Sequence, residues 1–249
     1  MRRLAFVCVL TAITLQLPTS ANPEAVALRG VPRLVLWAWE RPEDLRGLGP
    51  DTGVAFLAQT IAIAGDRFTV APRLQPLRVS PSTTLIAVTR IEVAASSALS
   101  LTSDQVHALA VAVSRSARLP RVRGVQIDFD AAASERAFYR DLLRQLRAEI
   151  DPEAALSVTA LASWCEGDDW LRGLPIDEAV PMLFRMGTVD QPFRELGRSG
   201  DWNAIGCRGA LGVSLDEQFV VRSRGRRMYV FSPKPWTDAA VLQARQVMQ

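Results

Sequence analysis

Histidine and lysine are almost absent from this sequence, which contains a single residue of each, His107 and Lys234. His107 lies beside Val106 and near Leu109 in a helical pattern, so we expect it on the surface of a helix. Without a second histidine, neither a Ser-His-Asp triad nor a histidine-rich metal site is expected. Arginine therefore carries almost all of the positive charge.

Long apolar runs are also lacking. Leu4–Leu17 is mostly apolar and uncharged, but its roughly 14 residues fall short of the roughly 20 that span a membrane. Arg2 and Arg3 precede this run and small residues follow it at 18–21, a pattern typical of a secretory signal peptide. We predict a signal peptide over 1–21, a mature domain over 22–249 and a periplasmic or secreted location. An uncleaved membrane anchor is the alternative; after cleavage no stable membrane span is expected.

An excess of charge of one sign is missing too. Without Arg2 and Arg3 the chain keeps 27 of its 29 basic residues against 26 acidic ones. This near balance gives no indication of a nucleic-acid partner.

Cysteine is scarce. Cys8 lies in the predicted signal peptide, which leaves Cys165 and Cys207 in the mature chain. An even number of cysteines in an exported protein favours a disulfide between them. Two buried free thiols are the alternative.

Eight short apolar runs rich in β-formers follow one another along the chain. They are predicted to be strands, and the segments between them are too long for simple hairpins. The runs are Arg33–Glu40, Gly53–Ala62, Thr84–Glu92, Val122–Asp130, Ala155–Trp164, Ala179–Met186, Arg208–Asp216 and Arg227–Ser232.

Helical patterns occupy several of the gaps. Thr102 and Gln105 form a capping box, and the apolar spacing after them continues until Pro120. A second helix is predicted over 134–150 and a last one from Thr237 towards the C-terminus. Asp66–Ser82 contains three prolines and is predicted to form a hairpin excursion between strands 2 and 3.

Strands that alternate with helices predict a parallel sheet, and eight such units predict closure into a single-domain (β/α)₈ TIM barrel. An open doubly wound α/β sheet is the alternative, but no glycine-rich phosphate loop follows the first strand. In such barrels the active site lies at the C-terminal ends of the strands. The candidate site residues at those ends are Trp37, Trp39, Glu40, Arg90, Glu92, Asp128, Asp130, Trp164, Arg185, Asp216, Glu217, Lys234 and Trp236.

The fourth predicted strand is the most informative. Val125, Ile127 and Phe129 share one face, which we expect to meet the helices. Asp128 and Asp130 then share the inward face, where their mutual repulsion favours a raised pKa for one of them. A carboxyl group with a raised pKa is what a general acid requires.

The seventh predicted strand has the same alternation and brings Asp216 and the adjacent Glu217 to the mouth. Facing carboxylates on strands 4 and 7 are the catalytic groups that glycoside hydrolysis uses. Alternatively, the acids form buried ion pairs with Arg90, Arg185 or Lys234. A divalent metal held by Asp128, Asp130 and Asp216 is a third hypothesis; the favoured interpretation needs no metal or cofactor.

Tryptophans and arginines have two interpretations each. Trp37, Trp39, Trp164 and Trp236 fall near strand ends, where they can stack on sugar rings or fill the core. The run Arg222, Arg224, Arg226 and Arg227 is predicted to be a solvated loop, with contact to an anionic polymer as the alternative.

The fourth strand resembles the D-G-x-D-x-D-x-E motif of chitinase-type glycoside hydrolases. Gly124 and Asp128 keep their places in the motif, whereas Arg123 and Gln126 replace acids and Asp130 replaces the catalytic glutamate. In the sixth strand the M-x-Y-D motif reads 182–185 with Phe and Arg at its last two positions. The resemblance therefore implies a related barrel without chitinase activity.

Over most of the mature chain the sequence resembles a bacterial exported family known as domain of unknown function 3142. The segments that carry this resemblance are 36–44, 126–130 with Tyr139, Pro181–Met182 and 214–217. The resemblance implies a glycoside-hydrolase-like barrel and supplies no established activity.

The leading hypothesis is a barrel that acts on a bacterial polysaccharide by carboxylate acid/base chemistry. Asp130 would be the acid, Asp216 or Glu217 its partner, and Asp128 would tune Asp130. The alternatives are a non-catalytic barrel that binds a saccharide and a scaffold in envelope assembly.

Overall fold

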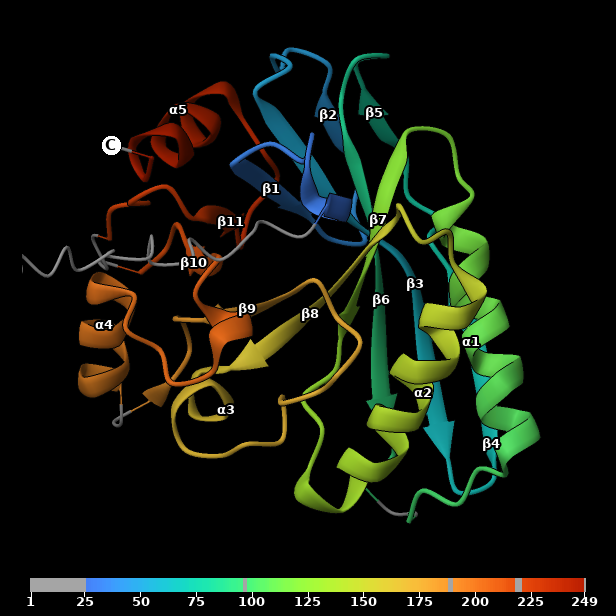
Figure 1. The fold of residues 1–249 in the computed structure, drawn as a ribbon. Helices are drawn as coiled ribbons and strands as arrows, with labels where there is room; N and C mark the ends of the chain where they lie inside the picture. The colour runs from blue at the N-terminus through green and yellow to red at the C-terminus, as the bar shows by residue number, and fades with distance from the viewer. Residues whose placement is uncertain (1–25, 96–97, 188–189, 218–220, 249) are drawn as a thin grey trace, which may run out of the picture.

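The computed structural model describes residues 26–95, 98–187, 190–217 and 221–248. The predicted signal peptide and its boundary at residue 21 lie outside these ranges. Eight parallel strands form the centre of the fold (Figure 1). They are β1 (Leu34–Ala38), β3 (Thr52–Ala64), β6 (Leu85–Val93), β7 (Val122–Asp128), β8 (Ala155–Leu161), β9 (Glu178–Met182), β10 (Ala210–Ser214) and β11 (Arg227–Phe231).

The eight strands close into a barrel because β1 pairs in parallel with both β11 and β3. The remaining strands follow in chain order around the barrel. Each predicted strand overlaps one barrel strand, so the predicted parallel α/β barrel is confirmed. The strongest signal was the length of the connections, which excluded antiparallel hairpins.

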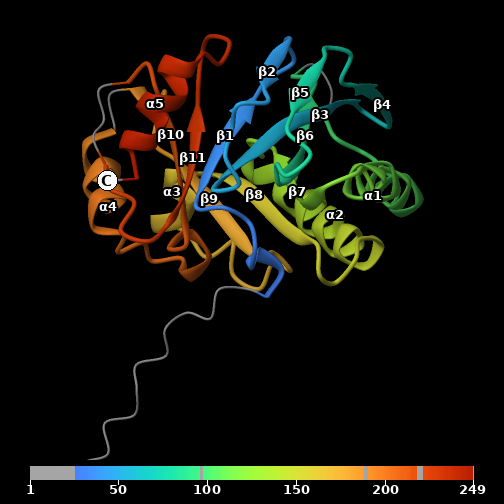
Figure 2. The ribbon, with the colours of Figure 1, turned by 90° about the horizontal axis from the view of Figure 1, so that it is seen from above.

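The helices are fewer than the predicted (β/α)₈ pattern requires. In Figure 2, α1 and α2 lie on one side of the barrel and α4 and α5 on the other. The helices are α1 (Ser103–Ala117), α2 (Arg136–Glu149), α3 (Ala162–Glu166), α4 (Asp190–Ser199) and α5 (Asp238–Gln246), with short 3₁₀ turns at Val26–Leu28, Ala133–Glu135 and Ile205–Cys207. None of the helices in the described ranges has the length and apolar character needed to cross a bilayer.

Short strands take the place of helices early in the chain. β2 (Glu43–Leu45) follows β1, and β4 (Arg67–Pro72) and β5 (Leu77–Val79) follow β3. β4 pairs antiparallel with β3, whereas β5 pairs in parallel with β2. The excursion between the second and third barrel strands therefore joins two different partners, and its prolines exclude a helix there.

A β-bulge between Leu57 and Gln59 changes which side chains of β3 face the barrel interior. Before the bulge, Leu57 packs inside the barrel. After it, Gln59 turns outward and its Nε2 donates to Thr89 Oγ1 at 3.0 Å. The extra residue exchanges the two faces of the strand, so that Ile61 and Ile63 join the outer core instead of the barrel interior.

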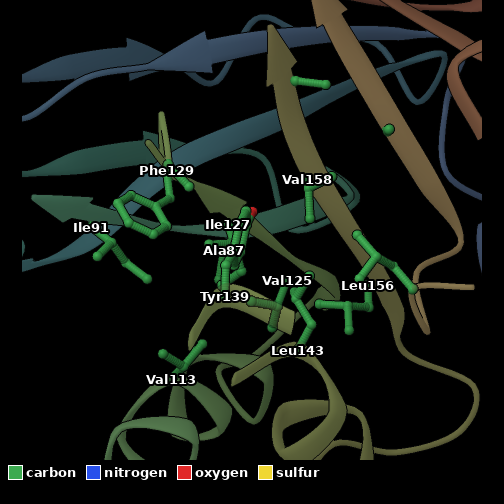
Figure 3. Packing of buried hydrophobic residues seen from close by; sticks show 14 of the residues in the cluster. Ala87, Ile91, Val113, Val125, Ile127, Phe129, Tyr139, Leu143, Leu156 and Val158 are labelled. Atoms are coloured by element: carbon green, nitrogen blue, oxygen red, sulfur yellow. The ribbon is translucent and has the colours of Figure 1, made fainter. Parts of the chain in front are cut away.

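The outer core lies between the strands and the helices (Figure 3). Val125 and Ile127 of β7, with Phe129 directly after it, meet Tyr139 and Leu143 of α2 there, which confirms the predicted outward face. Each large apolar side chain buried in this way contributes about 1.5–3 kcal/mol. The helix α1 begins with the predicted capping box of Thr102 and Gln105.

The barrel interior is mixed rather than apolar. Apolar side chains from several strands share it with a polar cluster near the middle and base. Glu178 accepts from Arg227 at 2.7 Å and from the Tyr229 hydroxyl at 2.5 Å. Gln126 accepts from Trp37 Nε1 at 2.9 Å and donates to Ser157 at 3.1 Å. These bonds satisfy polar groups that burial would otherwise leave unpaired.

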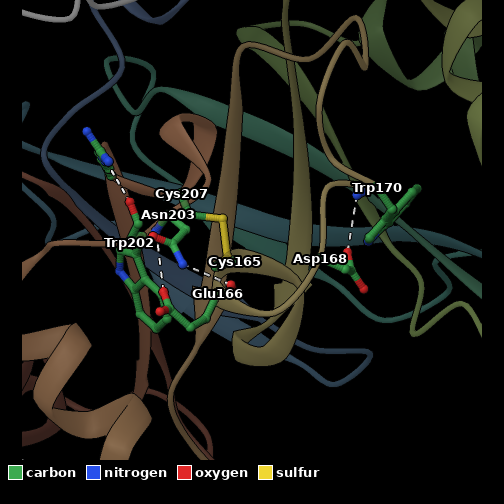
Figure 4. Close-up of a disulfide and its surroundings, with 8 residues drawn as sticks. Cys165, Glu166, Asp168, Trp170, Trp202, Asn203 and Cys207 are labelled. Atoms are coloured by element: carbon green, nitrogen blue, oxygen red, sulfur yellow. Dashed lines mark hydrogen bonds between the residues drawn. A yellow bond between two sulfur atoms is a disulfide. The ribbon is translucent and has the colours of Figure 1, made fainter.

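A disulfide joins Cys165 of α3 to Cys207 in the turn before β10, as predicted (Figure 4). Both cysteines are fully buried. Asn203, close to the bridge, donates from its side chain to the backbone oxygen of Glu166 at 3.0 Å. The bridge therefore fastens the connection after β8 to the connection before β10.

Loss of this disulfide is expected to lower the free energy of unfolding by about 2–4 kcal/mol, because the bridge closes a loop with a sequence separation of 42 residues. The measurement is urea unfolding of the Cys165→Ala, Cys207→Ala double variant against the oxidised protein. Reduced wild type serves as the control, since it lacks the bridge without a substitution. Equal stability of all three proteins would contradict the expectation.

Candidate functional site

A cavity of about 460 Å³ opens at the mouth of the barrel, where the strands end. Its walls come from the ends of β1, β6, β7, β8, β9 and β11 and from α3 and α4. The lining residues are Trp39, Arg90, Asp128, Asp130, Leu161, Ala162, Ser163, Met182, Phe184, Arg185, Met186, Phe193 and Phe231. The cavity thus combines an aromatic and apolar wall with four charged side chains.

Asp128 is the buried carboxylate of this cavity, with 6% of its surface exposed. Its Oδ2 pairs with Arg90 Nη1 at 3.0 Å, and its Oδ1 accepts from Thr159 Oγ1 at 2.8 Å. The alternation of β7 and β8 places these side chains together, because Asp128 and Thr159 both face inward. Two specific partners therefore fix the carboxylate in place.

Burial raises the pKa of Asp128 above its ordinary value of 3.8. The nearby charge of Asp130 acts in the same direction, whereas Arg90 and the Thr159 hydroxyl oppose the rise. The predicted repulsion between Asp128 and Asp130 is thus present, but desolvation raises the pKa of Asp128 more than this repulsion does. Asp128 consequently holds a proton more readily than a free aspartate does.

Arg90 connects the acids of the mouth to an aromatic ring. Its Nε donates to Glu92 at 2.8 Å while its Nη1 reaches Asp128, and its guanidinium carbon lies 5.9 Å from the ring centroid of Trp39. Burial lowers the pKa of Arg90, but the bonds to Glu92 and Asp128 outweigh this and the net shift is upward. Four of the predicted site residues therefore form one network.

Asp130 lies at the rim of the cavity and is exposed. Within the described ranges it makes no hydrogen bond or ion pair. It also borders a second hollow of about 380 Å³ that shares Arg90, Asp128 and Asp130 with the first. The carboxylate of Asp130 is thus open to a ligand from either hollow.

The acids after the seventh barrel strand do not line the mouth cavity. Asp216 is exposed and accepts from the Ser214 hydroxyl. Glu217 is paired with Arg194 at 2.9 Å and accepts from the Arg185 backbone N–H at 2.5 Å. Glu217, one of the two predicted partners of Asp130, is therefore occupied in holding the connection after β9, and the other, Asp216, lies outside the lining of the cavity.

The four candidate tryptophans separate into one that lines the cavity and three that pack. Trp39 is half-buried in the cavity wall. Trp37 fills the barrel interior, and Trp236 donates to the Trp37 carbonyl oxygen at 2.9 Å. Trp164 packs edge-on against Trp170 at 4.9 Å in the outer core. Only Trp39 among them is open to a sugar ring in this cavity.

The remaining candidate residues differ in the same way. Arg185 lines the cavity with a positive φ of 56°, a conformation that is uncommon for a residue with a side chain. Glu40 accepts from the backbone N–H groups of Leu74 and Gln75 and so fixes that loop. Lys234 is exposed and lies outside the lining of the cavity.

The sequence-based prediction missed Thr159, which binds Asp128, and several residues that line the cavity. Thr159 could have been found, because it shares the inward face of its strand with Ser157. Phe231 likewise follows Tyr229 on the inward face of β11. Phe193 gave no comparable signal, since it comes from α4, whose position over the mouth depends on tertiary packing. Among the described residues no group of acids, histidines and cysteines has the arrangement of a metal site.

The raised pKa of Asp128 predicts a pH-dependent cost in stability. Above pH 3.8 the native state binds more protons at this position than the unfolded chain, so stability falls as the pH rises through the window above 3.8. Asp128→Asn removes the charge and keeps an oxygen for Arg90 and an amide for Thr159. We expect the difference in unfolding free energy, Asp128→Asn minus wild type, to increase from pH 4 to pH 7 in urea titrations.

Asp128→Ala is the matched control, because it removes the same charge but leaves Arg90 and Thr159 without their acceptor. It is expected to cost about 1–3 kcal/mol relative to Asp128→Asn. A difference between Asp128→Asn and wild type that stays constant or shrinks towards neutral pH would contradict the raised pKa.

Comparison with known proteins bears on the central part of the barrel. No curated protein matches the chain. The profile of a family described as a domain of unknown function (DUF3142) matches residues 82–192. This segment contains β6 to β9 and, with them, Arg90, Asp128, Asp130 and Arg185. The four charged side chains of the mouth cavity therefore all belong to the part of the chain that matches DUF3142.

Proposed function

We propose that the protein binds a saccharide in the cavity at the barrel mouth. The observation that carries this proposal is the composition of the cavity: an open aromatic wall faces a cluster of charged hydrogen-bonding groups. Trp39 and Phe184 are half-buried and offer apolar faces, with the buried Phe231 packed behind them, and Asp130 and Arg185 offer groups that hydroxyls can bond. Sugar rings have an apolar face and a hydroxyl-rich edge, and they match such a surface.

The cavity supports saccharide binding better than it supports a hydrolytic mechanism in which two carboxylates face each other. That mechanism needs a second carboxyl group about 5–10 Å from the first. Among the described residues, Asp128 and Asp130 are the only acids that line the cavity. Asp128 is buried and bound to Arg90 and Thr159, and Glu217 is bound to Arg194. In the part of the chain that the structure describes, no second free carboxylate therefore lines the cavity opposite Asp130.

Hydrolysis is kept as a second candidate because of one specific observation. Asp130 is exposed on the cavity wall without a partner in the described ranges, directly beyond a buried carboxyl group with a raised pKa. In this candidate, Asp130 gives a proton to the leaving oxygen of a bacterial polysaccharide as the glycosidic C–O bond breaks. A water molecule then bonds to the freed carbon and returns a proton to Asp130, while Asp128 with Arg90 positions the end of the strand.

We further propose that the protein works in an oxidising compartment, the periplasm or the exterior of the cell. The disulfide between two fully buried cysteines supports this location, since such bonds persist mainly outside the cytosol.

Trp39→Ala is expected to weaken saccharide binding about 5- to 30-fold, because it removes a stacking face worth roughly 1–2 kcal/mol. The measurement is titration calorimetry with a saccharide identified on an array of bacterial glycans. Leu242→Ala is the control, since Leu242 is an exposed apolar residue on α5 and does not line the cavity. An array without any bound glycan would contradict the proposal, and so would undiminished affinity of Trp39→Ala.

Asp130→Asn separates the two candidates on the same saccharide. If the barrel hydrolyses its ligand, this variant is expected to retain binding and lose roughly 10²–10⁴-fold in turnover. Asp66→Asn, an exposed aspartate in the turn between β3 and β4, is the control. Binding without turnover in the wild type supports the binding protein, and turnover unchanged in Asp130→Asn excludes Asp130 as the acid.

A further inference from the structure

A second charged cavity lies at the opposite end of the barrel, among the N-terminal ends of β1, β9, β10 and β11. Its volume is about 450 Å³. The charged residues in its lining are Arg33, Asp177, Glu178, Arg208, Arg224, Arg226 and Arg227. Five arginines from three segments of the chain therefore converge on one concave surface.

The two acids of this cavity are already neutralised. Glu178 is paired with Arg227 at 2.7 Å and accepts from Tyr229. Asp177 is paired with Arg147 at 3.3 Å and accepts from the Leu156 backbone N–H at 2.8 Å. Both carboxylates thus have their own cation, and neither balances the other arginines of the cavity.

Arg208, Arg224 and Arg226 form no ion pair with any acid in the described ranges. Arg208 is nevertheless held in place, because its Nε donates to the Trp202 carbonyl oxygen at 2.7 Å. Arg224 is exposed on a tight turn with a φ of 47°, next to Gly225 with a φ of 81°. The turn presents Arg224 at the cavity instead of folding it against the barrel.

Arg226 is buried, with 6% of its surface exposed, which departs from the solvated loop expected for this run. Its Nε and Nη2 donate to the carbonyl oxygens of Ser223 and Arg222, both at 3.1 Å, while its Nη1 has no hydrogen-bond partner. Burial, and then the charge of Arg224, lower its pKa. An anion in the cavity would stabilise the charge of this guanidinium, although its Nη1 is itself buried away from the cavity, beside Gly200.

Three glycines leave part of the wall of the cavity free of side chains. Gly206, Gly209 and Gly225 line it, and a Cβ atom added at any of them would meet nothing within 4 Å. The base of the barrel therefore has room for a ligand as well as charge for one. Guanidinium groups from separate segments, partly fixed by their own backbone contacts, are the usual means of binding phosphate oxygens.

We propose that this basal cavity, defined by Arg208, Arg224 and Arg226, binds a phosphate group. The phosphate belongs either to a free phosphorylated ligand or to the headgroup of an anionic phospholipid. The proposal is independent of the saccharide site, which lies at the other end of the strands.

The test is titration calorimetry of the full protein with inorganic pyrophosphate, together with cosedimentation with vesicles of phosphatidylglycerol or phosphatidylcholine. Arg224→Gly is the principal variant, because glycine tolerates the positive φ and the turn keeps its shape. Arg208→Ala is the second. Both are expected to weaken binding about tenfold or more. Arg222→Ala is the matched control, since Arg222 is exposed in the same loop but does not line the cavity.

Pyrophosphate binding that depends on Arg224 and Arg208 but not on Arg222 supports a free phosphorylated ligand. Binding to phosphatidylglycerol vesicles alone, with the same dependence, supports a lipid headgroup. The proposal is overturned if neither probe binds, if Arg222→Ala weakens binding as much as Arg224→Gly, or if Arg224→Gly and Arg208→Ala leave the affinity unchanged.

Discussion

The buried guanidinium of Arg227 connects the segment before β1 to the last barrel strand, β11. It pairs with Glu178 on β9 and donates to the carbonyl oxygens of Leu28, Val31 and Pro32, which precede β1. Arg227 itself begins β11, so one side chain holds the segments whose pairing closes the barrel. A buried pair of this kind is costly to desolvate, and breaking it by removing one partner typically costs about 3–5 kcal/mol. The base of the barrel depends on it.

Above this pair most strands alternate regularly between the two faces, with an interruption at the bulge in β3, and this alternation helped to make the fold predictable. Val125 and Ile127 face the helices while Gln126 and Asp128 face the interior, and the same rule holds for Leu211 and the residues beside it. Strands of a closed barrel have one face towards the interior and one towards the helices, so short alternating apolar runs, together with connections too long for hairpins, were sufficient to predict it. The alternation did not determine the number of helices, because a connection can return along the outside of the barrel to the start of the next strand without forming a helix.

The site was less predictable because the contacts of its side chains depend on the tertiary structure. Asp128, Asp130, Arg90 and Trp39 were found from their places at strand ends, and the structure does bring them together. Glu217 satisfied the same rule, but its neighbour Arg194 comes from α4, an element for which the sequence gave no clear signal. A position at a strand end therefore predicts that a residue lies near the mouth of the barrel. Whether its carboxylate has an ion-pair partner depends on the loops and helices between strands, whose positions the alternation does not predict.

Charge is distributed unevenly along the barrel axis. In the middle and at the core of the base, polar groups such as Gln126, Glu178 and Tyr229 are satisfied by one another. At the mouth, Asp128 retains a carboxyl group whose burial raises its pKa, and at the basal cavity Arg226 retains a guanidinium whose burial lowers its pKa. Both features cost stability that apolar or better-paired residues would restore. Such costs persist most readily where a ligand offsets them, so the two ends of the barrel, rather than its walls, are where binding is expected.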